Sequence, residues 1–166
     1  LALDKRKSKD LVNPKEEALL QECMGLLEED TPLREKPELC HDPLLRGYQF
    51  LSGKPLLYAW NTSEDEVASY ALPEGKAGQA HIAVSAKLER ELAEIEDPEE
   101  LEMFMTDLGV TESALSRVIA KTYELLGLIS FLTAGDKEVR SWPVRVGSTA
   151  PEAAGVIHSD FQKGFI

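Results

Sequence analysis

The sequence predicts an α/β fold in which two short parallel strands alternate with helices. Two apolar runs of strand length, residues 55–60 and 80–84, carry this prediction, because near-continuous apolar runs are typical of parallel strands that are buried on both faces. Helix-forming stretches follow each run, and this alternation builds βαβ units. After Gly127 the pattern changes to two strand-like runs joined by a turn, which predicts a domain boundary near this glycine.

A helical segment is expected before the strands. Asn13 and Pro14 open a helix, since Asn is a preferred N-cap and Pro suits the first helical position, and Glu16 is placed to bond back to the capping backbone. The apolar stripe along this helix requires a partner helix and comprises Leu19, Leu20, Cys23, Met24, Leu26 and Leu27. The basic residues before it would form the exposed tip of a helical arm: Lys5, Arg6, Lys7 and Lys9.

Five further helices are expected up to Gly127. The first runs from Asp42-Pro43 to a stop at Gly53, and a short one covers residues 64–70 between the two strands. The others run from Lys87 to about Ile95, from Asp97-Pro98 to Gly109, and from a Thr111 cap to Gly127. The last is expected to bury Leu115, Val118, Ile119, Tyr123, Leu125 and Leu126.

The C-terminal stretch predicts the opening of a β-grasp module. Strands are expected at 128–133 and 139–146, with Pro143 at an edge position or a bulge because proline cannot donate to a sheet ladder. A helix follows residues 149–151, and residues 164–166 have the character of a new strand. Both ends of the sequence fall inside expected elements, so we expect the chain to be part of a longer protein.

Composition excludes several classes of protein. Hydrophobic residues make up 43% of the 166 residues, enough for a core, so global disorder is not expected. The net charge of −12 argues against a protein that holds nucleic acid by its overall field, and no DNA partner is expected. No apolar run has the length of a membrane span. Two cysteines are too few for a disulfide framework, which predicts a cytoplasmic protein.

Each predicted parallel strand ends in a polar motif. Asn61-Thr62-Ser63-Glu64 follows the first strand and Ser85-Ala86-Lys87 the second. Ligands bind at the carboxyl ends of strands in an open α/β sheet, and an Asn side chain offers both a donor and an acceptor. This order resembles the fourth and fifth nucleotide-binding motifs of the translation-factor class of GTPases, with Glu64 where most of that class has Asp and Thr62 where it has Lys. The resemblance implies that purine-binding residues are Asn61, Thr62, Glu64, Ser85, Ala86 and Lys87.

Longer segments resemble the YchF family, the Obg-like ATPases. They are KPLLYAWNTSE (54–64), VSAK (84–87), YELLGLISFLTAG (123–135), KEVRSW (137–142) and APEAAGVIHSDFQKGFI (150–166). The resemblance is close from about residue 50 onward. It implies part of the parallel sheet of a P-loop NTPase (G domain) with a helical coiled-coil arm, followed by a TGS domain. The implied parts are the arm insertion with its return helix (1–53), the C-terminal part of the G domain (54–127) and the start of the β-grasp TGS domain (128–166).

The family resemblance also implies a function. Its members bind and hydrolyse ATP, often better than GTP, and associate with the ribosome, so ATP or GTP with Mg²⁺ and ribosomal RNA or protein are the implied ligands and partners. An Asp at the acidic position accepts hydrogen bonds from guanine N1 and N2, which adenine lacks as donors. We expect the longer Glu64 to lie differently, Asn61 and the Thr62 backbone to contact the adenine edge, and the Ser85 and Ala86 amides to close the other side. Lys87 would lie along the base or pair with a nearby acid.

Catalytic parts are not found in this sequence. It contains no G-x-x-x-x-G-K-[ST] loop and no following Asp-x-x-Gly for magnesium, which the resembled family carries upstream. We therefore expect no hydrolysis, no metal ligands and weak nucleotide affinity from this segment alone.

Two other functional classes stay open. One is a non-enzymatic module whose arm and TGS domain dock on RNA or the ribosome. The other is a synthetase-type or stringent-response-type protein that shares only the TGS domain. The pair His158 and Asp160 and the run Cys40-His41-Asp42 are patterns that acid–base and metal sites use, but no second Cys/His pair stands at zinc spacing, so a structural role is the simpler interpretation.

Overall fold

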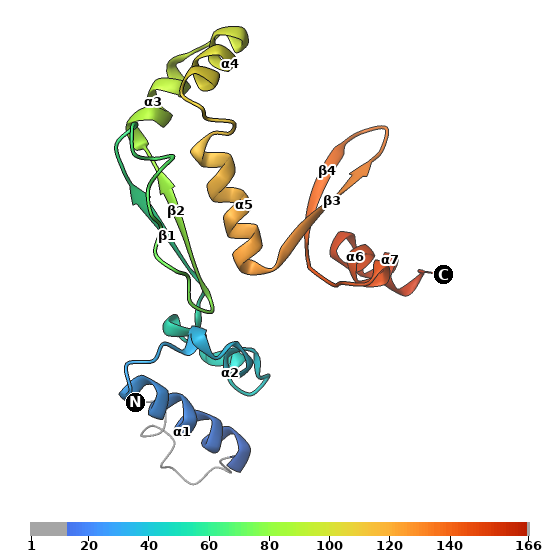
Figure 1. Cartoon of the computed structure of the whole chain (residues 1–166). Coiled ribbons are helices and arrows are strands. Elements are labelled where there is room, and N and C mark those ends of the chain that lie inside the picture. Colours follow the sequence, from blue (N-terminus) through green and yellow to red (C-terminus); the bar gives the residue numbers. More distant parts are fainter. Residues whose placement is uncertain (1–12, 166) are drawn as a thin grey trace. The chain divides into compact units, whose positions relative to one another are not determined.

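The computed structural model describes residues 13–165 and shows an α/β chain (Figure 1). It divides into two compact units, one that runs up to Tyr58 and includes Leu72–His81, and one that comprises Ala59–Ala71 and the chain from Ile82 onward. The basic residues expected at the tip of an arm, Lys5 to Lys9, lie outside the described residues. Within residues 13–165, no helix combines the length and apolar character that a membrane span requires.

The first helix begins where the sequence predicts. In α1 (Pro14–Glu28), Asn13 is the N-cap and its side chain accepts a hydrogen bond from Lys15 N at 3.1 Å. Only Leu20 and Cys23 of the apolar stripe are buried, whereas Met24 and Leu27 are 48% and 46% exposed. Leu19 and Leu26 pack against the same core while partly buried, so the stripe makes the core contact except at Met24 and Leu27.

Short helical turns, rather than one long partner helix, cover this face of α1. Leu20 and Cys23 pack with Leu33 of η2 (Leu33–Glu35), Leu39 of α2 (Pro37–His41) and Leu45. These five residues form the core cluster of the first unit.

The predicted continuous helix from Asp42 to Gly53 is wrong. The structure has a turn followed by η3 (Arg46–Tyr48) and η4 (Leu51–Gly53). The Asp42 side chain accepts a hydrogen bond from Leu44 N at 2.9 Å, which favours a turn over a helix. Gln49 has φ of 49°, a left-handed conformation that a right-handed helix cannot contain.

β1 (Leu56–Asn61) and β2 (Gln79–Val84) form a two-stranded sheet. Leu56 N donates to Gly78 O at 2.9 Å and Thr62 N donates to Val84 O at 2.8 Å. In both bonds the two partners are the same number of residues apart along the chain, as happens only when paired strands run in the same direction. The strands are therefore parallel, as predicted. Burial differs between them: β2 buries Ala80, Ile82 and Ala83, whereas β1 is partly exposed, so the expectation of full burial is wrong for β1.

Residues 64–70 do not form the predicted helix. They make consecutive turns in which Ser63 O accepts from both Glu66 N (3.3 Å) and Val67 N (3.1 Å). A helix of this length does not repay the cost of its first turn unless it packs on a core.

The next three helices occupy the predicted positions: α3 (Ala86–Glu94), α4 (Pro98–Asp107) and α5 (Ala114–Leu126). Two glycines with positive φ, Gly109 and Gly127, follow the last two of them, as the sequence predicts.

Two details of α5 are corrected. Ser113 rather than Thr111 caps the helix, since the Ser113 side chain accepts from Ser116 N at 3.2 Å. Leu115, Ile119 and Leu126, expected inside, are exposed.

The C-terminal elements begin with an antiparallel hairpin of β3 (Leu128–Ala134) and β4 (Val139–Arg145). Pro143 lies opposite Ser130 in this two-stranded ladder, so it occupies an edge strand as predicted. Two helices follow, α6 (Ala150–Ile157) and α7 (Ser159–Lys163). Of the strand expected at 164–166, Gly164 caps α7 instead, Phe165 is irregular, and Ile166 lies outside the described residues.

Candidate functional site

The structure brings the two strand-end motifs together at the same edge of the β1–β2 pair. Asn61 is the last residue of β1, and its Oδ1 accepts a hydrogen bond from the backbone N–H of Ala86, the first residue of α3, at 3.0 Å. Both motifs belong to the second unit. A side chain at the end of one strand thus holds the loop that follows the other.

Thr62 reinforces this junction. Its backbone N–H and its hydroxyl both donate to the carbonyl oxygen of Val84, at 2.8 and 3.3 Å. The N–H of Thr62 is therefore used within the protein, and its carbonyl is the backbone group available to a ligand.

Ser85 has a structural task at the start of α3. Its side chain is the N-cap and accepts a hydrogen bond from Leu88 N at 3.4 Å, and the residue is only 2% exposed. This cap fixes the direction in which α3 leaves the sheet, and with it the position of Lys87 in the first turn.

Lys87 connects the two loops electrostatically. Its Nζ lies 2.6 Å from Glu64 Oε1 and 3.6 Å from Glu91 Oε1. The hydrogen bond and charge of Glu64, followed by the charge of Glu91, raise the pKa of Lys87 above its usual value. The Glu64 side chain is 26% exposed and that of Lys87 is 66% exposed, so the Glu64 carboxylate is drawn toward the first turn of α3. The expectation that Lys87 pairs with a nearby acid fits this contact.

Two residues that the sequence does not single out support the same edge. Arg117 of α5 donates through Nη2 to the carbonyl oxygen of Ala83 in β2, at 2.7 Å. Glu89 of α3 accepts a hydrogen bond from Ala114 N at the start of α5. These contacts join residues distant in sequence and have no local signature, so only the folded chain reveals them.

The other candidate patterns have structural partners. Nδ1 of His158 accepts a hydrogen bond from Asp160 N at 3.2 Å and so caps α7. The Cys40 thiol donates to Leu33 O at 3.4 Å, and burial raises its pKa, which disfavours the reactive thiolate. Among the residues that the structure describes, no three His, Cys, Asp or Glu side chains gather in a group able to hold a metal ion.

Comparisons with known proteins identify relatives of this chain. The family model YchF-GTPase_C, described as a protein of unknown function (DUF933), matches residues 128–166. The chain is 41% identical over 178 residues to the "Ribosome-binding ATPase YchF" of Bacillus subtilis (strain 168), which covers 99% of this chain and 47% of that protein. The protein of the same name from Haemophilus influenzae is 45% identical over 128 residues, covering 74% of this chain and 35% of that protein.

A solved structure extends the comparison to the fold. The chain superposes on the "Structure of the Schizosaccharomyces pombe YchF GTPase" with a TM-score of 0.74 and 29% identity, covering 99% of this chain and 48% of that one. The chain thus spans about half the length of the relatives that it matches. Because similarity in sequence and in fold extends along nearly the whole chain, this chain belongs to the YchF family.

Proposed function

We propose that residues 61–64 and 85–87 form the base-reading edge of a purine-nucleotide site in a ribosome-associated Obg-like ATPase. The observation that carries this proposal is the hydrogen bond from Ala86 N to Asn61 Oδ1, because it puts both strand-end loops at one place. Relatives that match nearly the whole chain or most of it are named ribosome-binding ATPases, which supports the ribosome as partner and the cytoplasm as location.

The groups left at this edge are suited to adenine. Since Asn61 Oδ1 is bonded to Ala86, the Nδ2 amide of Asn61 is the donor that remains for a ring nitrogen of the base. The Thr62 carbonyl is an acceptor for the adenine amino group. The Ala86 N–H already donates to Asn61 Oδ1 and so is not free to bond guanine O6. This bond restricts the Ala86 part of the expectation that the Ser85 and Ala86 amides contact the base.

Glu64 supports a preference for ATP over GTP. Guanine recognition at this position requires a free carboxylate that accepts hydrogen bonds from N1 and N2. The Glu64 carboxylate is instead paired with Lys87 at 2.6 Å, and moving it to the base would break that pair. A ligand group left without its hydrogen bond lowers affinity strongly, so guanine is disfavoured.

The remaining parts of the proposal concern the longer protein. Residues 1–53 would belong to the arm and its return helix, 54–127 to the G domain, and 128–166 to the start of a TGS domain. Hydrolysis needs a phosphate-binding loop and Mg²⁺, and we assign neither to a residue of this chain.

Competitive binding of ATP and GTP by the intact protein tests the proposal. We expect ATP to bind more tightly, and Lys87→Met to raise GTP affinity relative to ATP by about tenfold, because it releases Glu64. Lys121→Met is the matched control, since it removes a surface lysine paired with Glu124 at 2.9 Å away from the two loops. A strong guanine preference in the unaltered protein would contradict the proposal, and no binding of either nucleotide would favour the interaction-module alternative.

A further inference from the structure

Helix α4 buries none of its apolar side chains completely: Met103 is 71% exposed, and Leu101, Phe104 and Met105 are half-buried. A helix of ten residues draws most of its stability from packing an apolar face, and α4 has little such packing in the described part of the chain.

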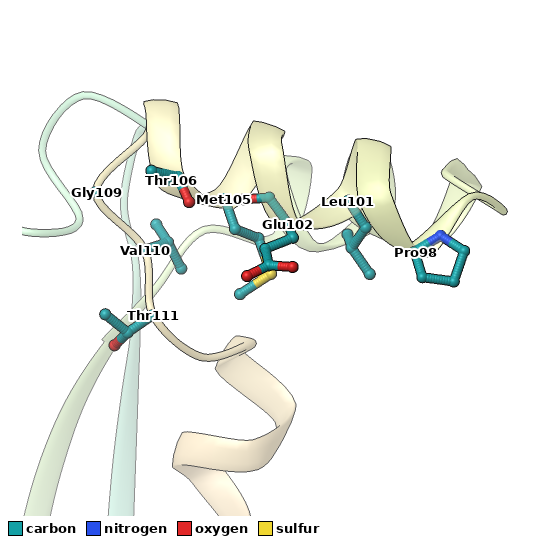
Figure 2. Close-up of a pocket in the computed structure, with 8 residues that line it drawn as sticks. All are labelled: Pro98, Leu101, Glu102, Met105, Thr106, Gly109, Val110 and Thr111. Atoms are coloured by element: carbon teal, nitrogen blue, oxygen red, sulfur yellow. Dashed lines mark hydrogen bonds between the residues drawn. The ribbon is translucent and has the colours of Figure 1, made fainter.

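One side of α4 borders an apolar cavity of about 480 Å³. The turn after the helix builds it: Gly109, with φ of 65°, reverses the chain, and Val110 N donates to Met105 O at 2.9 Å. Figure 2 shows Leu101 and Met105 projecting from the helix, with Val110 on the returning loop. The full lining is Pro98, Leu101, Glu102, Met105, Thr106, Gly109, Val110 and Thr111. A cavity of this size accepts several aliphatic side chains.

A second cavity on the same helix, of about 420 Å³, is acidic. It is lined by Glu99, Glu102, Met103, Thr106 and Asp107, and so shares Glu102 and Thr106 with the apolar cavity. Its three carboxylates have no ion-pair partner among the described residues. The sequence from Glu91 to Ser116 contains nine acidic residues and no Lys or Arg.

An apolar cavity beside an acidic one is complementary to a segment that carries aliphatic side chains on one side and amines or guanidinium groups on the other. An amphipathic helix presents such a pattern at three- and four-residue spacing and binds in grooves of this kind. The same carboxylates repel the phosphates of RNA, so charge favours a protein segment over a nucleic acid. From this combination we propose that a cationic amphipathic helix of a protein partner docks on the α4 surface, which we define as α4 together with residues 108–111.

Fluorescence anisotropy with a synthetic probe tests this on the full chain. The probe is a labelled leucine–lysine peptide of about four helical turns, with leucines along one face. A scrambled peptide of the same composition and a single-stranded RNA are the comparison ligands. We expect the ordered peptide to bind at least about tenfold more tightly than the scrambled one, and the RNA not to bind.

Two kinds of variant locate the site. Met105→Glu in the apolar cavity is expected to weaken peptide binding about tenfold, whereas Met24→Glu on α1, at a half-exposed methionine, leaves it unchanged. The double variant Glu99→Lys, Glu102→Lys changes two exposed positions and is expected to weaken peptide binding similarly. The control is the double variant Glu22→Lys, Glu28→Lys on α1. Circular dichroism checks that each variant keeps its helical content.

Three results would overturn the proposal. Equal binding of ordered and scrambled peptides would mean non-specific attraction between charges. Binding that Met105→Glu and the double charge reversal leave intact would place the peptide elsewhere. No binding of the ordered peptide at millimolar concentration, or tighter binding of the RNA, would remove a cationic protein segment as the partner.

Discussion

At the scale of single residues, Asn61 joins the two loops through its one side-chain oxygen. Asn61→Ala removes the acceptor for Ala86 N–H and is expected to lower the free energy of unfolding by about 1 kcal/mol. Asn61→Asp keeps an acceptor in place and is expected to cost less. Urea unfolding of the three proteins measures both changes, and an equal loss in the two variants would mean that this hydrogen bond does not hold the loops.

Lys87, also at the scale of a single residue, makes the stability of the folded chain depend on pH. Its pKa is raised in the folded chain by Glu64 and then Glu91, so the stability from these contacts is fully present below the usual value of 10.5. It is lost as the pH rises through the raised pKa. We expect the decline of stability at alkaline pH to be shallower in Lys87→Met, as measured by unfolding at a series of pH values. The same decline in both proteins would contradict a contribution from the pair.

The residue scale also shows where sequence-based prediction ends. The strand-end positions of Asn61 and Ser85 follow from local pattern, and so does the possibility of an acidic partner for Lys87. Two hydrogen bonds could not be predicted in this way: the one from Ala86 N to Asn61 and the one from Arg117 to Ala83. Both depend on which strands are neighbours, and a local sequence pattern does not show this.

At the scale of elements, substitutions of two glycines distinguish the cost of backbone strain from the cost of a steric clash. Gly127 ends α5 with φ of 62° and has open space where a Cβ would stand, so Gly127→Ala is expected to cost about 1 kcal/mol from the left-handed backbone alone. Gly78 has φ of 69°, and its Cβ would meet Arg34 O at 2.7 Å. Gly78→Ala should therefore be clearly more destabilising, and thermal unfolding that ranks them in the opposite order would contradict the packing around Gly78.

Helix α6 gives an element-scale pH test. Thr149 N and Oγ1 both donate to Glu152 Oε2, at 2.7 and 2.9 Å, and these bonds lower the pKa of Glu152. The stability they give is present above the usual carboxyl pKa and is lost as the pH falls through the lowered one. We expect acid to reduce the helicity of the unaltered chain more than that of Glu152→Gln, as measured by circular dichroism. Equal losses would show that the capping box does not contribute.

Elements with strong end signals are the ones that the sequence predicts well. Asn13-Pro14, Asp97-Pro98 and Gly127 mark helix ends correctly because caps act locally. The predicted helix at 42–53 is wrong because the Asp42 side chain favours a turn and Gln49 takes a left-handed conformation, although Leu45 packs in the core. The predicted helix at 64–70 is wrong because backbone turns replace a helix too short to repay the cost of its first turn.

At the scale of the whole molecule, the chain is a pair of compact units with a net charge of −12. Family membership is predictable from sequence, because the resemblance read from long segments such as 54–64 and 150–166 agrees with the 41% identity that extends over 99% of the chain. The exposure of apolar residues on α4 and α5 is not predictable, since the 3.6-residue pattern gives a face for packing but not what covers it.

The most direct test of the purine-binding edge is an NMR titration of the ¹⁵N-labelled chain with adenosine and, separately, guanosine at millimolar concentration. Nucleosides carry no phosphate, so they report on the base-reading loops alone. We predict that adenosine shifts the Asn61 side-chain amide and the backbone signals of Thr62 and Ala86 more than guanosine does. Largest shifts far from residues 61–64 and 85–87, larger effects of guanosine, or no shifts in either titration would contradict the account.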